Sequence, residues 1–262
     1  MRKLISLTRL GIINSFIERA DIFLYTISNC IAPLVILFVW LSFTPAGAFS
    51  VYSHDQLIWY FLLVMLIKLV TSAWGGQFLA ARIRRGAISP YLAQPMPYVF
   101  HYLSNNLAEK IVKLIILLPF LGCLIILFRL ALPTINLLNL VTVFYSTLIA
   151  MALFFIIDII IGLLSFWFDE TTAIGETYGL LYSLFSGVFI PLTALPPAIR
   201  GLGHILPFRF TLSLPIEIFL NQLTSREIYI GLLLQLVWLL AAGGLCRILW
   251  LRGLKIYSAS GA

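Results

Sequence analysis

The sequence predicts an all-α integral membrane protein with six transmembrane helices, a short cytoplasmic helix and an extracellular re-entrant helical hairpin before the last span. Hydrophobic residues make up 61% of the 262 residues and charged residues only 10%, whereas about a quarter of the residues are charged in soluble proteins. Several apolar runs exceed the roughly 18 residues that mark a membrane-spanning helix, and no series of alternating segments of about ten residues indicates a barrel.

The six expected spans leave no room for a soluble domain, so residues 1–262 form one transmembrane domain. The spans cover residues 21–43, 56–80, 108–130, 138–165, 173–190 and 229–250. Lys and Arg favour the cytoplasmic side of a membrane, and they are unevenly divided in this topology. One side carries Arg2, Lys3, Arg9, Arg19, Arg82, Arg84, Arg85, Lys110, Lys113, Arg247, Arg252 and Lys255, and the other carries Arg129, Arg200, Arg209 and Arg226. Both termini are therefore expected in the cytoplasm.

Residues 1–20 form a basic cytoplasmic N-terminal segment in this topology. No short apolar core with a small-residue cleavage site follows "MRKLISLTRLGIINSF", so we expect the segment to be retained. Its basic side chains suit a headgroup region, but its apolar residues are spread around a helical wheel instead of gathering on one face. The sequence therefore favours the cytoplasmic side here more than it favours a helix.

The cytoplasmic link after the second span contains a local signal for a short helix. Ser89 followed by Pro90 is typical of an N-cap with proline at the first helical position, and Pro95 ends the helix after about one turn. A single exposed turn has little stability of its own, which indicates that something packs against it. Tyr91 and Leu92 would then be offered to a cleft in a partner. A plain loop that re-enters the membrane is the alternative.

The extracellular segment 191–228 stays apolar while its prolines forbid one continuous helix. Non-helical backbone at membrane depth is tolerated only inside protein or beside a wet cavity, since unpaired amides are costly in lipid. We therefore expect a re-entrant helical hairpin that dips into the outer leaflet, with an apolar surface loop as the alternative. Arg209 and Glu217 could pair or gate the outer mouth, together with the bends at Pro191 and Pro207.

Two ionisable residues lie inside expected spans, Lys68 in the second and Asp158 in the fourth. Such residues cost on the order of 3 kcal/mol at a helix centre and usually face a cavity or each other. They are candidates for a solute pathway. Three roles stay open for them: an ion pair with each other, a lining role for either, or snorkelling and protonation.

Motifs for catalysis, nucleotide binding and metal binding are missing from the sequence. It contains no GxxxxGK[ST], no HExxH and no GxSxG, so we expect no catalytic, nucleotide or metal site in this chain. His54, His101 and His204 are far apart and lack ligand spacing. The net charge is +7, and the basic residues lie beside hydrophobic runs, where they suit contact with lipid headgroups. Nucleic acid is therefore not an expected partner.

Four stretches of the sequence carry a resemblance to a known family. They are RIRRGAISPYLAQPM after the second span, LLSFWFDET at the end of the fourth, LFSGVFIPLTALPPAIRGLGHILPF followed by Pro215, and ILWLRGLKIY near the C-terminus. In this order they resemble the membrane subunit of an ABC exporter of the ABC-2 type, in the small six-span permease branch. The resemblance implies an interfacial connecting helix at the N-terminus and a coupling helix from Ser89 to Gln94, within the coupling segment 81–107. That segment would dock on an ATPase through Gly86, Ser89, Pro90, Tyr91, Leu92, Gln94 and Pro95.

The resemblance also implies an export function driven from outside the chain. The permease would move an amphipathic or hydrophobic solute across the bacterial cytoplasmic (inner) membrane, in contact with its lipids. ATP and Mg would bind to a cytoplasmic ATPase subunit present in two copies, so this chain would hold no cofactor and have no enzyme activity. A second permease, either a related chain or another copy of this one, would complete the membrane part.

Two other classes of function stay open. A stand-alone secondary transporter or channel would use Lys68 and Asp158 as an ion or proton relay, although no inverted repeat is visible in the sequence. An intramembrane hydrolase or transferase would draw its groups from Asp158, Asp169, Glu170 and Glu176.

Overall fold

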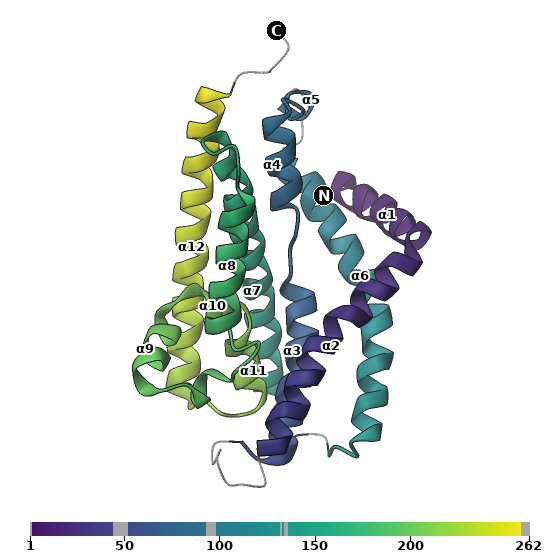
Figure 1. Cartoon of the computed structure of the whole chain (residues 1–262), viewed down its shortest axis with the longest axis vertical. Helices are drawn as coiled ribbons and strands as arrows, with labels where there is room; N and C mark the ends of the chain where they lie inside the picture. Colours follow the sequence, from purple (N-terminus) through teal and green to yellow (C-terminus); the bar gives the residue numbers. More distant parts are fainter. Residues whose placement is uncertain (1, 44–51, 93–97, 132, 134–135, 258–262) are drawn as a thin grey trace.

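The computed structural model describes residues 2–43, 52–92, 98–131, 133 and 136–257, and these residues form helices without any strand (Figure 1). The α-helices are α1 (Arg2–Ile17), α2 (Arg19–Phe43), α3 (His54–Thr71), α4 (Gly76–Arg84), α5 (Ser89–Leu92), α6 (Tyr98–Leu127), α7 (Leu137–Leu163), α8 (Thr172–Phe185), α9 (Pro197–Ile205), α10 (Pro207–Thr211), α11 (Ser213–Phe219) and α12 (Ser225–Ile256). The helix α5 and the C-terminal end of α12 lie at one end of the bundle, and α9 lies toward the other (Figure 1). The predicted all-α class is confirmed for the described residues.

Five helical segments of the described chain are long and apolar enough to cross a membrane. They are Arg19–Ser42, His54–Arg84, Tyr98–Leu127, Leu137–Phe166 and Ser225–Ile256. The helix α8, which occupies the expected fifth span, has 14 residues. At about 1.5 Å per residue it is about 21 Å long, shorter than a hydrocarbon core of about 30 Å. A total of six spans therefore stays a prediction.

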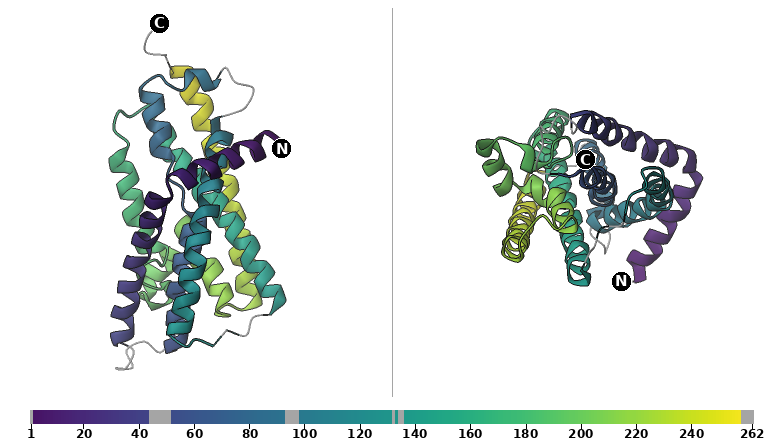
Figure 2. Two further views of the ribbon diagram at one scale, coloured as in Figure 1. Left: turned by 90° about the vertical axis from the view of Figure 1, so that its right-hand side faces the viewer. Right: turned by 90° about the horizontal axis from the view of Figure 1, so that it is seen from below.

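The N-terminal segment is helical, and its helix α1 lies across α6 (Figure 2). The contact is close at Gly11, where an added Cβ would lie 2.8 Å from the Ala108 Cβ. Packing against α6 accounts for a helix that the scattered apolar residues of this segment did not indicate. The helix α6 itself begins at Tyr98, well before the expected start of the third span at 108, and this extension supplies the surface under α1.

Three long helices begin with a side-chain cap at the end of the bundle that is farther from α5. Ser53 and Gln56 form a capping box on α3, and Thr224 and Glu227 form another on α12. Asn136 caps α7 by accepting a backbone N–H through its side chain. Each cap satisfies backbone donors that a helix start leaves without partners, so these short polar signals define where the chain turns back into the bundle.

The second span is present but is not one continuous helix. The helices α3 and α4 are separated at residues 72–75, where the chain runs without helical structure (Figure 1). Beside this break, Gly76 packs closely on Gly162 of α7. A Cβ added to Gly162 would lie only 2.9 Å from the Gly76 Cα, so the two backbones meet at a distance that glycine alone allows.

The proline-rich segment after α8 folds into α9, α10 and α11, and proline stands in the first turn of α9 and of α10. The side chains of α10 and α11 are buried on two sides. Phe208, Leu212 and Ile216 join the apolar cluster around α3, and Phe210, Leu214 and Ile218 pack with Leu153 of α7 and Ala242 of α12. The segment is therefore packed into the bundle, and its depth in a membrane stays a prediction.

Candidate functional site

The short helix α5 follows a tight turn that ends α4. Gly86 has a φ of 70°, a left-handed conformation that favours glycine, and its N–H donates to the Ile83 carbonyl at 3.1 Å. The Ser89 hydroxyl donates to the Gly86 carbonyl at 3.1 Å, and its oxygen lies 3.0 Å from the Tyr257 hydroxyl oxygen, just after α12. These contacts hold α5 against the C-terminal end of α12.

The two side chains of α5 that were expected to meet a partner differ in their surroundings. The Tyr91 ring packs edge-on against Tyr98 with the centroids 5.0 Å apart, and the Arg82 guanidinium carbon lies 4.8 Å from the Tyr91 centroid. Pro90 is exposed, and Leu92 leaves 43% of its surface open. Tyr91 therefore anchors α5, and Pro90 and Leu92 form its free face. Two further residues of the predicted set lie outside the described residues, Gln94 and Pro95.

Asp158 of α7 holds the break in the second span. Its Oδ2 accepts the Gly76 N–H at 2.8 Å and the Tyr102 hydroxyl at 2.9 Å. The Tyr102 oxygen in turn accepts the N–H of Trp74 at 3.0 Å and the N–H of Gly75. These three N–H groups stand at the start of α4, where a helix offers them no internal partner. Side chains of α6 and α7 thus satisfy backbone that would be costly to leave unpaired at membrane depth.

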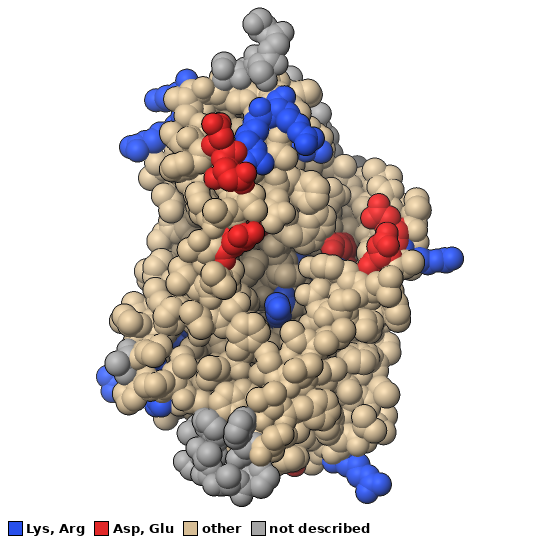
Figure 3. Space-filling model, in the orientation of Figure 1, with Lys and Arg blue, Asp and Glu red and all other residues tan. Residues whose placement is uncertain are grey.

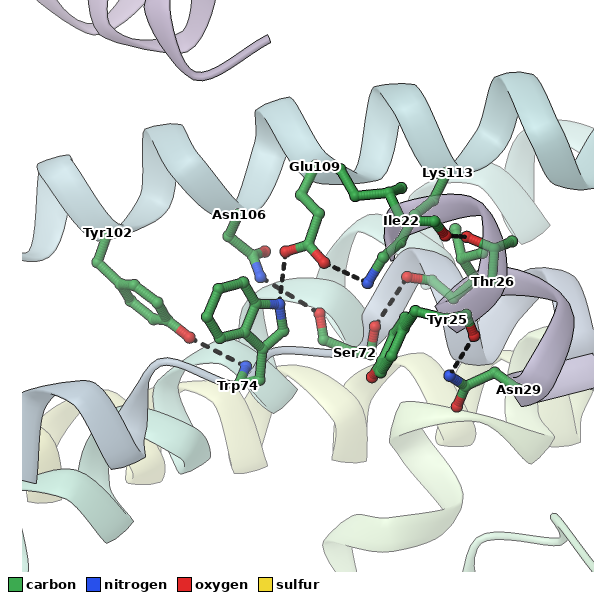
Figure 4. Close-up of polar contacts among 11 residues, drawn as sticks. Ile22, Tyr25, Thr26, Asn29, Ser72, Trp74, Tyr102, Asn106, Glu109 and Lys113 are labelled. Carbon is green, nitrogen blue, oxygen red and sulfur yellow. Dashed lines mark hydrogen bonds and ion pairs between the residues drawn. The ribbon is translucent and has the colours of Figure 1, made fainter. Parts of the chain in front are cut away.

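Further polar contacts from α6 secure the residues just before α4 (Figure 4). The Trp74 Nε1 donates to Glu109 Oε2 at 2.5 Å, and Glu109 also pairs with Lys113, one turn further along α6. Asn106 Nδ2 donates to the Ser72 carbonyl at 3.5 Å. Figure 4 shows the side chains of Asn106 and Glu109 directed from α6 toward the connection between α3 and α4. The break is therefore a defined, hydrogen-bonded structure.

Asp158 was among the predicted site residues, but the polar residues of α6 that hold the break with it were not. Tyr102, Asn106 and Glu109 follow one another at helical spacing and lie on one face of α6. These polar residues in the first half of a helix whose second half is largely apolar, together with the adjacent Gly75 and Gly76, are the signal in the sequence that points to this structure.

The structure does not bring Lys68 and Asp158 together. Among the described residues, neither side chain has an ion-pair partner. Asp158 faces the start of α4, whereas Lys68 lies near the end of α3 and lines a cavity with residues of α2 and α6. The ion-pair alternative for these two residues therefore has no support in the geometry.

The predicted outer residues lie in the proline-rich segment, and two of them, Arg209 and Glu217, form an ion pair. Arg209 Nη2 lies 2.6 Å from Glu217 Oε2, and the two side chains are 8% and 3% exposed. Pro207 begins α10, which carries Arg209, and Pro191 precedes the short 3₁₀-helix Leu192–Ala194. This buried ion pair joins α10 to α11. Removal of either side chain would leave the other charge buried and uncompensated.

The chain just after α8 is tied to α3 and α11. The buried Tyr60 hydroxyl donates to the Gly187 carbonyl at 2.7 Å, and the Ser213 hydroxyl donates to the Ser186 carbonyl. Gly187 has a φ of 89°, and a Cβ there would clash with the Tyr60 and Ser213 side chains. The turn that leads into the proline-rich segment is therefore fixed by side chains from two other helices.

The fold and these sites define a polytopic helical membrane protein, with long apolar helices and a broken span whose backbone is satisfied from neighbouring helices. On the face in Figure 3, charged side chains lie at both ends and around mid-height, and most of the remaining surface is uncharged. The described residues hold no group of three or more His, Cys, Asp or Glu that could bind a metal ion.

The chain belongs to the ABC-2 transporter family, because residues 20–261 match the family described as ABC-2 family transporter protein. Permeases of this family are transport subunits that are not themselves catalytic, and they work with a partner ATPase. No curated protein and no solved structure matched the chain.

Proposed function

We propose that this chain is the permease subunit of an ATP-driven exporter, which moves an amphipathic or hydrophobic solute across the bacterial cytoplasmic membrane. ATP and Mg bind to a separate cytoplasmic ATPase subunit. The observation that carries the proposal is α5, a helix of four residues with an exposed Leu92. One helical turn with an apolar side chain on its free face is suited to a surface that a partner covers.

The contacts of α5 suit it to receive a push from the ATPase. Tyr91 packs on Tyr98 of α6, and Ser89 meets Tyr257 after α12. The helix α4 leads from α5 to the contact of Gly76 with α7. In this proposal, closure of the ATPase subunits around ATP displaces α5, and α4 carries the displacement to α7. The displacement shifts the equilibrium between inward-facing and outward-facing states.

The two ionisable candidates take different roles in this mechanism. Asp158 positions the joint between α3 and α4, because both of its hydrogen bonds go to groups that hold this joint. Lys68 lines the solute pathway, since it belongs to the wall of a cavity. A relay between the two residues, as a secondary transporter would need, has no direct contact to support it.

At the outer end, the segment 191–228 acts as a lid over the exit. Its support is the burial of α10 and α11 and the ion pair between Arg209 and Glu217, which makes the two helices move as one body. The bends before Pro191 and Pro207 are the hinges of this lid. The lid lies in the outer leaflet as a re-entrant pair.

The complete exporter contains two ATPase subunits and a second permease, either a related chain or another copy of this one. The orientation places both termini in the cytoplasm. It is supported by the arrangement in Figure 1, where α5 and the end of α12 share one end of the bundle, and by the Lys and Arg residues near that end.

The docking role of α5 is tested by replacing Leu92 with Asp in the full chain. The variant should insert into the membrane, and the ATPase that co-purifies with the wild-type chain from native membranes should be lost. Leu92 projects from α5 and Leu202 is an exposed leucine of α9, so Leu202→Asp is the matched control at the opposite end. It should retain the ATPase. Undiminished co-purification with Leu92→Asp would refute the docking assignment.

A further inference from the structure

We propose that the cavity between α2, α3 and α6 binds an acidic headgroup, so that the solute of this permease is an anionic amphiphile. This inference rests on the proposed function and adds the charge of the solute and the place where its headgroup lies. The cavity has a volume of about 90 Å³. Its lining consists of Tyr25, Thr26, Asn29, Cys30, Met65, Lys68, Leu69, Ser72 and Lys113.

The charge around this cavity is positive and only partly compensated. Lys113 has a carboxylate partner in Glu109, and its Nζ lies 4.1 Å from the centroid of the Tyr25 ring. No acidic side chain of the described residues lies within ion-pair distance of Lys68. The cavity lining thus holds two ammonium groups, those of Lys68 and Lys113, and a single carboxylate, that of Glu109, pairs with one of them.

An anion would supply the missing counter-charge. A cation inside a membrane protein is costly unless it meets an opposite charge, so Lys68 favours an anionic group in the cavity over a neutral one. Thr26 and Asn29 of α2 and Ser72 just after α3 add hydroxyl and amide side chains to the same lining (Figure 4). A cavity needs roughly 10–15 Å³ to hold one water molecule, so a cavity of about 90 Å³ has room for a small anionic group such as a phosphate and not for an acyl chain.

The hydrocarbon part of the solute has a place outside the cavity. Tyr25 at the cavity wall begins an exposed stripe that continues through Ala32 and Val39, each about two turns further along α2. In a membrane this stripe faces lipid chains. A solute can therefore keep its chain in the lipid while its headgroup lies beside Lys68. Figure 3 shows a hollow near mid-height of the molecule with a basic side chain in it.

The test measures binding to the full chain in nanodiscs of phosphatidylcholine. Dioctanoyl phosphatidylglycerol offers an acidic headgroup with short chains, dioctanoyl phosphatidylcholine offers the same chains without net charge, and inorganic phosphate offers charge without chains. We expect the phosphatidylglycerol to bind more tightly than the other two probes. Lys68→Gln should weaken this binding by about tenfold or more, as the loss of one charged hydrogen bond does.

Two further variants separate the cavity from general effects of charge and folding. Lys68→Arg keeps the cation and should restore tight binding of phosphatidylglycerol. Lys255→Gln removes an exposed cation at the end of α12, away from the cavity lining, and should leave the binding unchanged. Each variant is first checked for a single symmetrical peak in gel filtration, and a Lys68→Gln chain that fails this check is replaced by Lys68→Met.

The proposal is overturned if removal of the Lys68 cation leaves phosphatidylglycerol binding unchanged, or if phosphatidylcholine binds equally well. Displacement of phosphatidylglycerol by inorganic phosphate at equal concentration would also overturn it, since the site would then serve a free anion. Leu92→Asp leaves the cavity intact and should not alter lipid binding. If the chain binds phosphatidylglycerol through Lys68 but no ATPase co-purifies with it, only the transport role is refuted. If the ATPase co-purifies but phosphatidylglycerol binding does not depend on Lys68, only the headgroup site in the cavity is refuted.

Discussion

Replacing Asp158 with alanine should lower the free energy of unfolding, because two donors lose the oxygen that they share. The Gly76 N–H and the Tyr102 hydroxyl both donate to Asp158 Oδ2, at 2.8 and 2.9 Å. A buried donor left without a partner costs about 1–3 kcal/mol, so two donors together give about 2–6 kcal/mol. Hydrogen bonds between helices in membrane proteins contribute about 0.6 kcal/mol each on average, so the loss of these two bonds should cost at least about 1 kcal/mol.

The measurement is reversible unfolding of the full chain in mixed micelles with increasing dodecyl sulfate. Asp158→Asn keeps a carbonyl oxygen that can take the place of Oδ2, so its loss should be clearly smaller than that of Asp158→Ala. Glu176→Ala removes an exposed carboxylate of α8 and should change little. If Asp158→Ala unfolds at the same dodecyl sulfate fraction as the wild type, Asp158 does not hold the broken span and the reasoning fails.

Two further changes test other contacts by the same unfolding measurement. Glu217→Leu should cost about 3–5 kcal/mol, because it leaves the buried guanidinium of Arg209 uncompensated, and the double variant with Arg209→Met should regain most of this loss. A double variant as unstable as the single one would contradict the interpretation of a self-contained pair. Gly162→Ala should cost about 1–3 kcal/mol, because its Cβ would lie 2.9 Å from a Cα of α4. Gly179→Ala, with no atom within 4 Å of the added Cβ, should be neutral, and equal losses for the two glycines would refute the close contact.

Local signals predicted the parts of the fold that depend on neighbouring residues. Ser89 followed by Pro90 indicated a helix start, and α5 begins at Ser89, one residue before the predicted first position. The predicted N-cap bond is absent from the described residues, and the Ser89 hydroxyl instead donates back to the Gly86 carbonyl. The prolines after α8 indicated broken helices, and α9, α10 and α11 occupy that segment. Long apolar runs predicted five of the six expected spans, because the length of an apolar run can be read directly from the sequence.

The broken second span could not be predicted in this way, because the groups that stabilise it come from other helices. Residues 72–75 contain no proline, and the run from α3 to α4 is apolar enough to be interpreted as one helix. The break is stable because Tyr102 and Asp158 supply acceptors from α6 and α7. Lys68 and Asp158 were both predicted as pathway candidates because both lie inside expected spans, and the sequence does not show which helices surround them. Depth along a span does not tell which neighbour a side chain faces.

The non-helical residues 72–75 divide the second span into two helices, α3 and α4. A twist that enters through α5 meets the Gly162 contact on α7 before it can reach α3, since the chain between the two helices is not helical. If α5 receives the stroke of an ATPase as proposed, small fluctuations at that end of the bundle should be absorbed at the joint. Only a displacement large enough to strain the Tyr102 anchor should then reach α3, so the joint would filter out partial strokes.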